Sequence, residues 1–199
     1  MMRTLVLGGA RSGKSTHAEQ LVMGAAAVDY VATSAVNPDD AEWVERIALH
    51  QARRPGHWRT LETADIASVL RTPSALSGEA VEPVVLVDCL GVWITRMMDE
   101  CGIWEEPNSP AEPTSPAEPV EAPRARLQRR IDEVVAAVEQ TRREVVFVSN
   151  EVGQGVVPAH WSGRFFRDQL GILNTRVAAA CERVVFCTAG IPMTLKDAS

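Results

Sequence analysis

The sequence predicts a three-layer α/β fold in which helices cover both faces of a mostly parallel central sheet. Two observations carry this prediction. Short valine-rich runs without polar alternation recur along the chain, as in strands that are buried on both faces. Helical patterns separate these runs, and strands that alternate with helices favour a parallel sheet. The 199 residues suit a single domain with a sizeable core.

The expected elements alternate in order along the chain. The predicted strands are Thr4–Leu7, Tyr30–Thr33, Val84–Val87, Val145–Ser149 and Val184–Thr188. The predicted helices cover about residues 14–25, 39–53, 91–101, 124–142 and 164–182. The second helix has a capping-box pattern at its start, Asp39 with Glu42, and Pro55 after its end. Because ligands bind beyond the carboxyl ends of such strands, the residues after each strand are the candidates for a site.

A phosphate-binding loop follows the first predicted strand. Gly8-Gly9-Ala10-Arg11-Ser12-Gly13-Lys14-Ser15 fits the pattern G-x-x-x-x-G-K-[ST], between an apolar run and a helical pattern. Glycines let backbone N–H groups approach phosphate oxygens at a helix N-terminus. We expect Lys14 to reach the β- and γ-phosphates and Ser15 to offer its hydroxyl to Mg²⁺. The chain is therefore predicted to bind a nucleoside triphosphate in a P-loop NTPase-type, RecA-like fold.

Polar residues also follow the other predicted strands. The third strand is followed by Asp88, as in the Walker B arrangement that holds Mg²⁺, although such an aspartate can instead cap the next helix. Asp88 and Gly91 fit the short D-x-x-G pattern of GTPase switches, but the sequence lacks an Asn-Lys-x-Asp motif for guanine. Ala32-Thr33-Ser34 and the glycine-containing loop at 149–155 either line a nucleotide site or turn the chain.

A histidine lies among arginines on the second predicted helix. Arg46, His50 and Arg54 are spaced by four residues and so share one helix face. Neighbouring positive charges favour the neutral, nucleophilic imidazole, and the same arginines can hold a triphosphate. The alternative is a surface histidine on a basic helix face, and the residues by themselves favour that alternative.

Composition narrows the function classes. The formal net charge of −6 argues against a general nucleic-acid binder or a protein that binds anionic membranes, and no apolar run is long enough to insert stably in a membrane. The four cysteines form no C-x-x-C pair, and the N-terminus has no signal-like pattern. We therefore expect reduced thiols and a cytoplasmic location.

One segment departs from the α/β pattern. Residues 105–123 hold six prolines and five glutamates without lysine, arginine or an aromatic residue. Such a stretch cannot build a core, so we expect an extended, mobile surface insertion. Without its five glutamates the formal charge changes from −6 to −1, which places most of the acidity in the insertion.

Together these motifs resemble one family over nearly the whole chain. Seven motifs occur in the same order as in that family. They are GGARSGKS, Tyr30–Ser34, Arg46-Ile47-x-x-His50, His57-Trp58-Arg59-Thr60-x-Glu62, Asn150–Pro158, Phe166–Asp168 and Asn174-x-Arg176-Val177-Ala178. The chain is similar to the bifunctional adenosylcobinamide kinase/adenosylcobinamide-phosphate guanylyltransferases of cobalamin biosynthesis. Without the resemblance, a P-loop kinase for another small hydroxyl substrate and a GTP-binding regulatory switch remain alternatives.

The resemblance implies two reactions and a set of site residues. ATP or GTP phosphorylates adenosylcobinamide; GTP then guanylylates an enzyme histidine, and adenosylcobinamide phosphate takes the GMP to give adenosylcobinamide-GDP. The resemblance makes His50 that histidine, with Lys14 at the triphosphate and Mg²⁺ at Ser15 and Asp88. It also implies a homotrimer. The implied nucleotide contacts are Gly8, Gly9, Ala10, Arg11, Ser12, Gly13, Lys14, Ser15, Ala32, Thr33, Ser34, Gln51, Ala52, Arg53, Arg54, Glu62 and Asp88.

Overall fold

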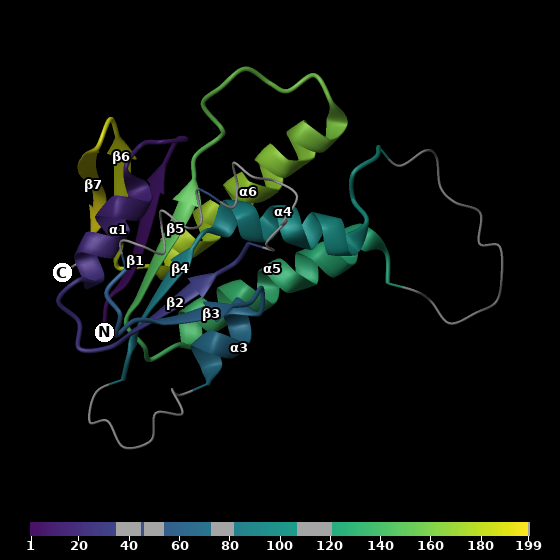
Figure 1. The fold of residues 1–199 in the computed structure, drawn as a ribbon. Coiled ribbons are helices and arrows are strands. Elements are labelled where there is room, and N and C mark those ends of the chain that lie inside the picture. Colours follow the sequence, from purple (N-terminus) through teal and green to yellow (C-terminus); the bar gives the residue numbers. More distant parts are fainter. Residues whose placement is uncertain (35–44, 46–53, 73–81, 107–120, 199) are drawn as a thin grey trace.

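The computed structural model describes residues 1–34, 45, 54–72, 82–106 and 121–198, and within them a seven-stranded sheet forms the centre (Figure 1). Its strand order is β3-β2-β4-β5-β1-β6-β7. β1 to β6 run parallel, and β7 pairs with β6 in the antiparallel sense. The strands are β1 (Arg3–Gly8), β2 (Val28–Ala32), β3 (Arg59–Glu62), β4 (Val84–Asp88), β5 (Val145–Asn150), β6 (Arg183–Thr188) and β7 (Ile191–Asp197).

Helices pack on both faces of this sheet, which gives three layers (Figure 1). The helices are α1 (Lys14–Val22), α3 (Ile66–Arg71), α4 (Leu90–Cys101), α5 (Pro123–Gln140) and α6 (Trp161–Ala180). Ala18 and Val22 of α1 share one apolar cluster with the sheet. The other helices bury their apolar residues in a second, larger cluster on the opposite face. This is the three-layer, mostly parallel fold that the sequence predicts.

The central strands are rich in apolar residues because successive side chains enter different clusters. In β1, Leu5 packs toward α4 to α6, whereas its neighbour Val6 packs toward α1. Phe147 and Val148 divide in the same way in β5. A strand between two helical layers needs apolar residues on both faces, so its sequence does not alternate. The five predicted strands are therefore confirmed, with small shifts at their ends.

Three elements were not predicted. β3 is a short edge strand whose four residues are alternately half-buried and exposed. α3 has six residues, and the Asp65 carboxylate caps it by accepting a hydrogen bond from the amide of Ser68 at 3.0 Å. β7 is largely exposed. The predicted helix 39–53 lies outside the described residues except for Glu45, and the predicted insertion does so over 107–120.

The carboxyl ends of the parallel strands meet at one edge of the sheet. Ala32 is in register with Glu62 on one side and with Asp88 on the other. Gly8, where the phosphate loop begins, is in register with Asn150. The fold therefore brings to one edge the candidate residues that follow β1, β2, β3, β4 and β5.

Candidate active site at the carboxyl edge of the sheet

The loop between β1 and α1 has the backbone geometry of a phosphate cradle. Gly13 adopts φ +89°, and a Cβ atom on it would lie 3.0 Å from the Cα of Gly190. Both the backbone angle and the available space therefore require glycine. α1 begins directly afterwards at Lys14, and the first N–H groups of a helix attract anions because they lack intrahelical partners. The loop offers the donors that a triphosphate needs.

Lys14 folds back over this loop. Its side chain is 6% exposed, and its Nζ donates a hydrogen bond to the carbonyl oxygen of Gly9 at 3.1 Å. An ammonium carries three N–H donors, so this contact leaves others for phosphate oxygens. Ser15 lies half-buried in the first turn of α1. The arrangement fits a lysine that neutralises phosphate charge from within the loop.

Distant segments of the chain support the loop. The amide of Gly190, in the turn between β6 and β7, donates to the carbonyl oxygen of Ser12 at 3.0 Å. Ala189 and Gly190 in this turn have φ values of +50° and +79°. After β5, the amide of Glu151 donates to the carbonyl oxygen of Gly8 at 3.1 Å. The cradle is thus held in place by residues from the last quarter of the sequence.

Asp88 ends β4 and does not cap the helix that follows. The N-cap of α4 is Cys89, whose Sγ accepts a hydrogen bond from the amide of Val92 at 3.4 Å. Burial, and then the charge of Asp88, raise the pKa of the Cys89 thiol to about 11, so this thiol is neutral at neutral pH. Asp88 itself is half-buried at the carboxyl edge. Its carboxylate therefore stays available for the site.

Tyr30 contacts two of the predicted site residues, although sequence reasoning assigned it no role. Its hydroxyl donates to Asp88 Oδ2 at 2.9 Å, and the guanidinium carbon of Arg54 lies 3.4 Å from its ring centroid. Tyr30 is 3% exposed, and burial, followed by the charge of Asp88, raises the pKa of its hydroxyl. The hydroxyl therefore stays protonated and donates. No local pattern reveals this, because the contacts join residues 24 and 58 positions apart.

The other predicted residues at this edge differ in accessibility. Thr33 is fully buried, and its hydroxyl donates to the carbonyl oxygen of Cys89 at 2.9 Å and accepts from the Cys89 amide at 3.0 Å. That side chain therefore fixes the start of α4. Ala32 and Ser34 beside it are half-buried, and Glu62 is exposed. The positions predicted for the nucleophile and its neighbours, His50, Gln51, Ala52 and Arg53, lie outside the described residues.

A buried polar network holds the end of β5. The Ser149 hydroxyl donates to Asn174 Oδ1 at 2.6 Å, and Asn174 Nδ2 donates to the carbonyl oxygen of Asn150 at 3.0 Å. Ser149 is fully buried and Asn174 is 5% exposed. Asn174 belongs to a segment that supports the resemblance. In the structure its side-chain amide joins α6 to the end of β5, because the amide both accepts and donates a hydrogen bond there.

The donor set fits Mg²⁺ bound together with a nucleotide. Within the described ranges, no three His, Cys, Asp or Glu side chains gather into a metal cage. Mg²⁺ does not need one, because it binds through one or two carboxylates, substrate phosphates and water. Asp88 supplies a carboxylate and Ser15 a hydroxyl at the same edge as the phosphate loop. These two residues would hold the ion.

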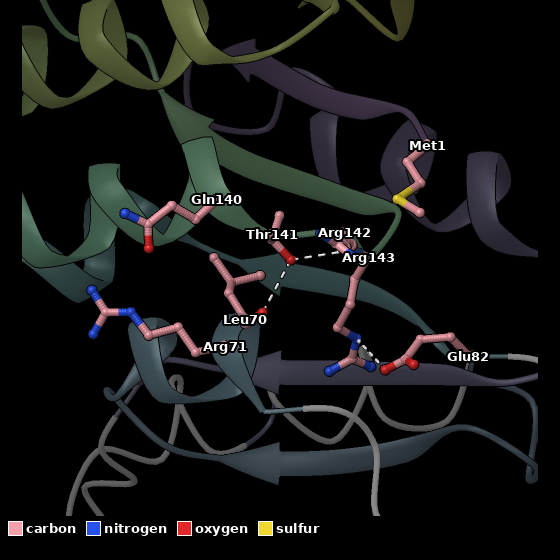
Figure 2. Close-up of a pocket in the computed structure, with 8 residues that line it drawn as sticks. All are labelled: Met1, Leu70, Arg71, Glu82, Gln140, Thr141, Arg142 and Arg143. Carbon is pink, nitrogen blue, oxygen red and sulfur yellow. Dashed lines mark hydrogen bonds and ion pairs between the residues drawn. The ribbon is translucent and has the colours of Figure 1, made fainter.

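The amino edge of the sheet carries a different arrangement. Asp29 is 1% exposed and accepts hydrogen bonds from Arg59 Nε at 2.8 Å and from Arg143 Nη2 at 2.6 Å. Arg143 also donates to the carbonyl oxygens of Val69 and Pro83. Figure 2 shows the pocket beside it, about 490 Å³ in volume and lined by Met1, Leu70, Arg71, Glu82, Gln140, Thr141, Arg142 and Arg143. None of the predicted site residues lines this pocket.

No helix in the described parts of the chain is long and apolar enough to cross a membrane.

Residues 4–195 match the protein family described as cobinamide kinase / cobinamide phosphate guanyltransferase. The chain is 39% identical over 197 residues to the bifunctional adenosylcobalamin biosynthesis protein CobP of Pseudomonas aeruginosa, with 98% of both chains covered. It is 36% identical over 199 residues to the bifunctional adenosylcobalamin biosynthesis protein CobU of Salmonella typhimurium, with 98% of this chain and 100% of that one covered.

Among solved structures, the P4 protein of bacteriophage phi6 in complex with ADP has a TM-score of 0.40 and 15% identity. That match covers 96% of this chain and 54% of the P4 chain, a likeness too loose to bear on function. The family match spans most of the chain, and the two relatives agree with it in name and length. This chain therefore belongs to the cobinamide kinase / cobinamide phosphate guanyltransferase family and is a cobalamin biosynthesis enzyme with these two transferase activities.

Proposed function

We propose that this enzyme phosphorylates adenosylcobinamide with a nucleoside triphosphate and then transfers GMP from GTP to adenosylcobinamide phosphate through guanylylated His50. The observation that carries the proposal is the convergence of the phosphate loop, Asp88 and Arg54 at one edge of the sheet. Membership of a family described by its action on cobinamide and cobinamide phosphate supports the choice of the two substrates.

In the first step, the hydroxyl of adenosylcobinamide attacks the γ-phosphorus and the bond to the β-phosphate oxygen breaks. Lys14 and the N–H groups of the loop hold the β- and γ-phosphates while charge moves onto the leaving diphosphate. Ser15 and Asp88 would hold Mg²⁺, which would neutralise charge at the phosphates when bound. The proton of the attacking hydroxyl leaves to solvent.

In the second step, a ring nitrogen of neutral His50 attacks the α-phosphorus of GTP and pyrophosphate leaves. The resulting phosphoramidate is then attacked by a phosphate oxygen of adenosylcobinamide phosphate, which forms the diphosphate bond and frees the histidine. A covalent intermediate divides one difficult transfer into two easier ones. Arg54 is suited to hold transferred phosphoryl oxygens because its planar guanidinium donates to two oxygens at once.

The position of Arg54 supports this proposal. Arg54 stacks on Tyr30, whose hydroxyl reaches Asp88, so it lies close to the carboxyl edge. His50 precedes Arg54 by four residues in the sequence.

The experiment is covalent labelling. The protein is incubated with Mg²⁺ and GTP labelled at the α-phosphate and is then denatured. We expect acid-labile, alkali-stable label in the native enzyme and in His57→Ala, which serves as the matched histidine control, and none in His50→Ala. Label that survives in His50→Ala would refute the nucleophile. A kinase without the second step, or a GTP-binding switch, would retain no α-label in any variant.

The proposed assembly is a homotrimer, as the resemblance implies. Light scattering would then give about 65 kDa, three times the chain mass of 21.6 kDa. A mass near that of one chain, under conditions where the enzyme is active, would rule the trimer out as a requirement for activity.

A further inference from the structure

We propose that Tyr30 is a positioning residue for both transfers: its hydroxyl fixes the carboxylate of Asp88, and its ring fixes the guanidinium of Arg54. The inference rests on the proposed function, since it takes Asp88 and Arg54 to be parts of the nucleotide site.

The register of the sheet explains how the Tyr30 hydroxyl reaches Asp88. Tyr30 pairs with Leu86 of β4, so its side chain extends along the sheet to reach Asp88 two residues further on. The hydrogen bond of 2.9 Å occupies Oδ2 and leaves Oδ1 for a metal ion or its bound water. Partners that orient a metal-binding carboxylate in this way change metal affinity when they are removed.

The Tyr30 ring contacts Arg54 and Trp58, which follow His50 in the sequence. The guanidinium carbon of Arg54 lies 3.4 Å from the Tyr30 ring centroid, and Trp58 stacks on the same ring with centroids 6.5 Å apart. Tyr30 belongs to β2, which is hydrogen-bonded to a strand on each side. A cation over an aromatic face is attracted to it, so this fixed ring holds the start of the 54–58 segment against the sheet.

A purely structural tyrosine is the alternative. A buried hydroxyl needs a hydrogen-bond partner, and any acceptor would satisfy that need. Here the acceptor is the carboxylate proposed to hold the metal ion. A structural role predicts loss of stability alone, whereas a positioning role predicts a changed Mg²⁺ requirement.

The first test removes only the hydroxyl. In Tyr30→Phe we expect the Mg²⁺ concentration that half-maximally tightens binding of a non-hydrolysable GTP analogue to rise about 10-fold, with binding in the absence of Mg²⁺ unchanged. Calorimetry measures both. Thr141→Val is the matched control, because it also removes one hydrogen-bonded hydroxyl, donated to Leu70 at 3.0 Å at the opposite edge, and should leave both values unchanged.

Asp88→Asn separates this inference from the proposed function. We expect it to raise the Mg²⁺ requirement, and we expect Tyr30→Phe to add nothing in that background. An unchanged requirement in Tyr30→Phe, beside a raised one in Asp88→Asn, overturns the role of Tyr30 and leaves the proposed metal site standing. An unchanged requirement in Asp88→Asn overturns the metal site and the role of Tyr30 together.

The ring is tested with Tyr30→Leu, or with Tyr30→Met if circular dichroism shows that the leucine variant is unfolded. At saturating Mg²⁺ we expect guanylylation to slow about 10-fold further than in Tyr30→Phe, and Arg54→Ala to slow it little more in that background. Equal rates in the phenylalanine variant and in the ring-less variant would overturn the ring part of the proposal.

Discussion

At the scale of single residues, Lys14 tests whether both transfers use one phosphate loop. Lys14→Ala removes a buried ammonium from the loop, and loss of one electrostatic donor of this kind lowers kcat about 10²- to 10³-fold. We expect losses of this size in both the kinase and the guanylyltransferase assays. Guanylylation at a normal rate in Lys14→Ala would require a second nucleotide site.

The control for that variant is Lys196→Ala. Lys196 Nζ donates to carbonyl oxygens at the end of α6, including that of Ala178 at 2.9 Å. This substitution removes the same charge from a helix terminus and should leave both rates within about two-fold.

Glu182 gives the chain a pH-dependent contribution to stability. The guanidinium of Arg3, together with backbone N–H groups, lowers the pKa of Glu182 to about 2. Because the folded-state pKa lies below the unfolded value, the stabilisation is present above about pH 4.5 and is lost as the pH falls toward 2. The side chains of Arg3 and Glu182 are 22% and 30% exposed, so screening reduces the effect.

We therefore expect Glu182→Gln to lower the free energy of unfolding by about 1 to 2 kcal/mol at pH 7 and by much less at pH 2. Urea denaturation at the two pH values measures the difference. Glu121→Gln is the control, because Glu121 pairs with Arg129 on an exposed surface. Equal losses for Glu182→Gln at both pH values would show that packing, and not charge, is what the glutamate contributes.

Candidate site residues can be predicted from the sequence where a local pattern defines them. The phosphate loop is defined within eight consecutive residues, and Asp88 is defined by the end of one strand. Tyr30 was not predictable, because its contacts depend on the register of β2 against β4 and on the path of the chain after residue 54. The role of His50 stays a prediction, since that residue lies outside the described residues.

At the scale of elements, the predicted strands are those buried on both faces. A strand between two helical layers needs apolar residues on both faces, and the valines of β2, β4 and β5 make that visible in the sequence. Asp29 of β2 is an exception, because two arginines pair with its buried carboxylate. β3 and β7 lie at the edges of the sheet, where exposed and charged residues are tolerated. Their sequences therefore resemble loops, and only pairing with β2 and β6 makes them strands.

The contact between β5 and α6 depends on the Asn174 amide. Asn174→Leu would leave the buried Ser149 hydroxyl and the Asn150 carbonyl oxygen without their partner. We expect the free energy of unfolding to fall by about 2 to 3 kcal/mol. Denaturant titration measures this loss.

Thr175→Ala is the control on the same helix, because Thr175 is exposed and bonds only within α6 among the described contacts. It should change the free energy of unfolding by less than about 0.5 kcal/mol. Equal effects of the two substitutions would mean that the network contributes nothing beyond helix propensity.

At the scale of the whole molecule, the acidic insertion lies between two helices that pack on each other without it. Arg126 of α5 donates to the carbonyl oxygen of Cys101, the last residue of α4, at 3.0 Å. α5 starts at Pro123, which suits the first turn because proline lacks the N–H that is unpaired there. The helices before and after residues 107–120 are therefore joined by a contact that does not involve those residues.

We expect that replacing residues 107–120 with a short Gly/Ser linker leaves kcat and KM for GTP within a few-fold. Steady-state kinetics and light scattering measure activity and assembly. The matched control is a Gly/Ser linker as long as residues 107–120. It distinguishes the effect of losing the native sequence from the effect of shortening the segment. A large drop in activity or in molecular mass with both linkers would show that the insertion has a role of its own.

The support of the phosphate loop by the β6–β7 turn has a consequence for the newborn chain. Residues 8–15 are made early on the ribosome, but the amide that holds Ser12 belongs to Gly190, nine residues before the end of this sequence. The loop lacks this support until the turn between β6 and β7 has been synthesised. A chain interrupted before that turn is made therefore has a less well held loop, however well its first strand and helix have formed.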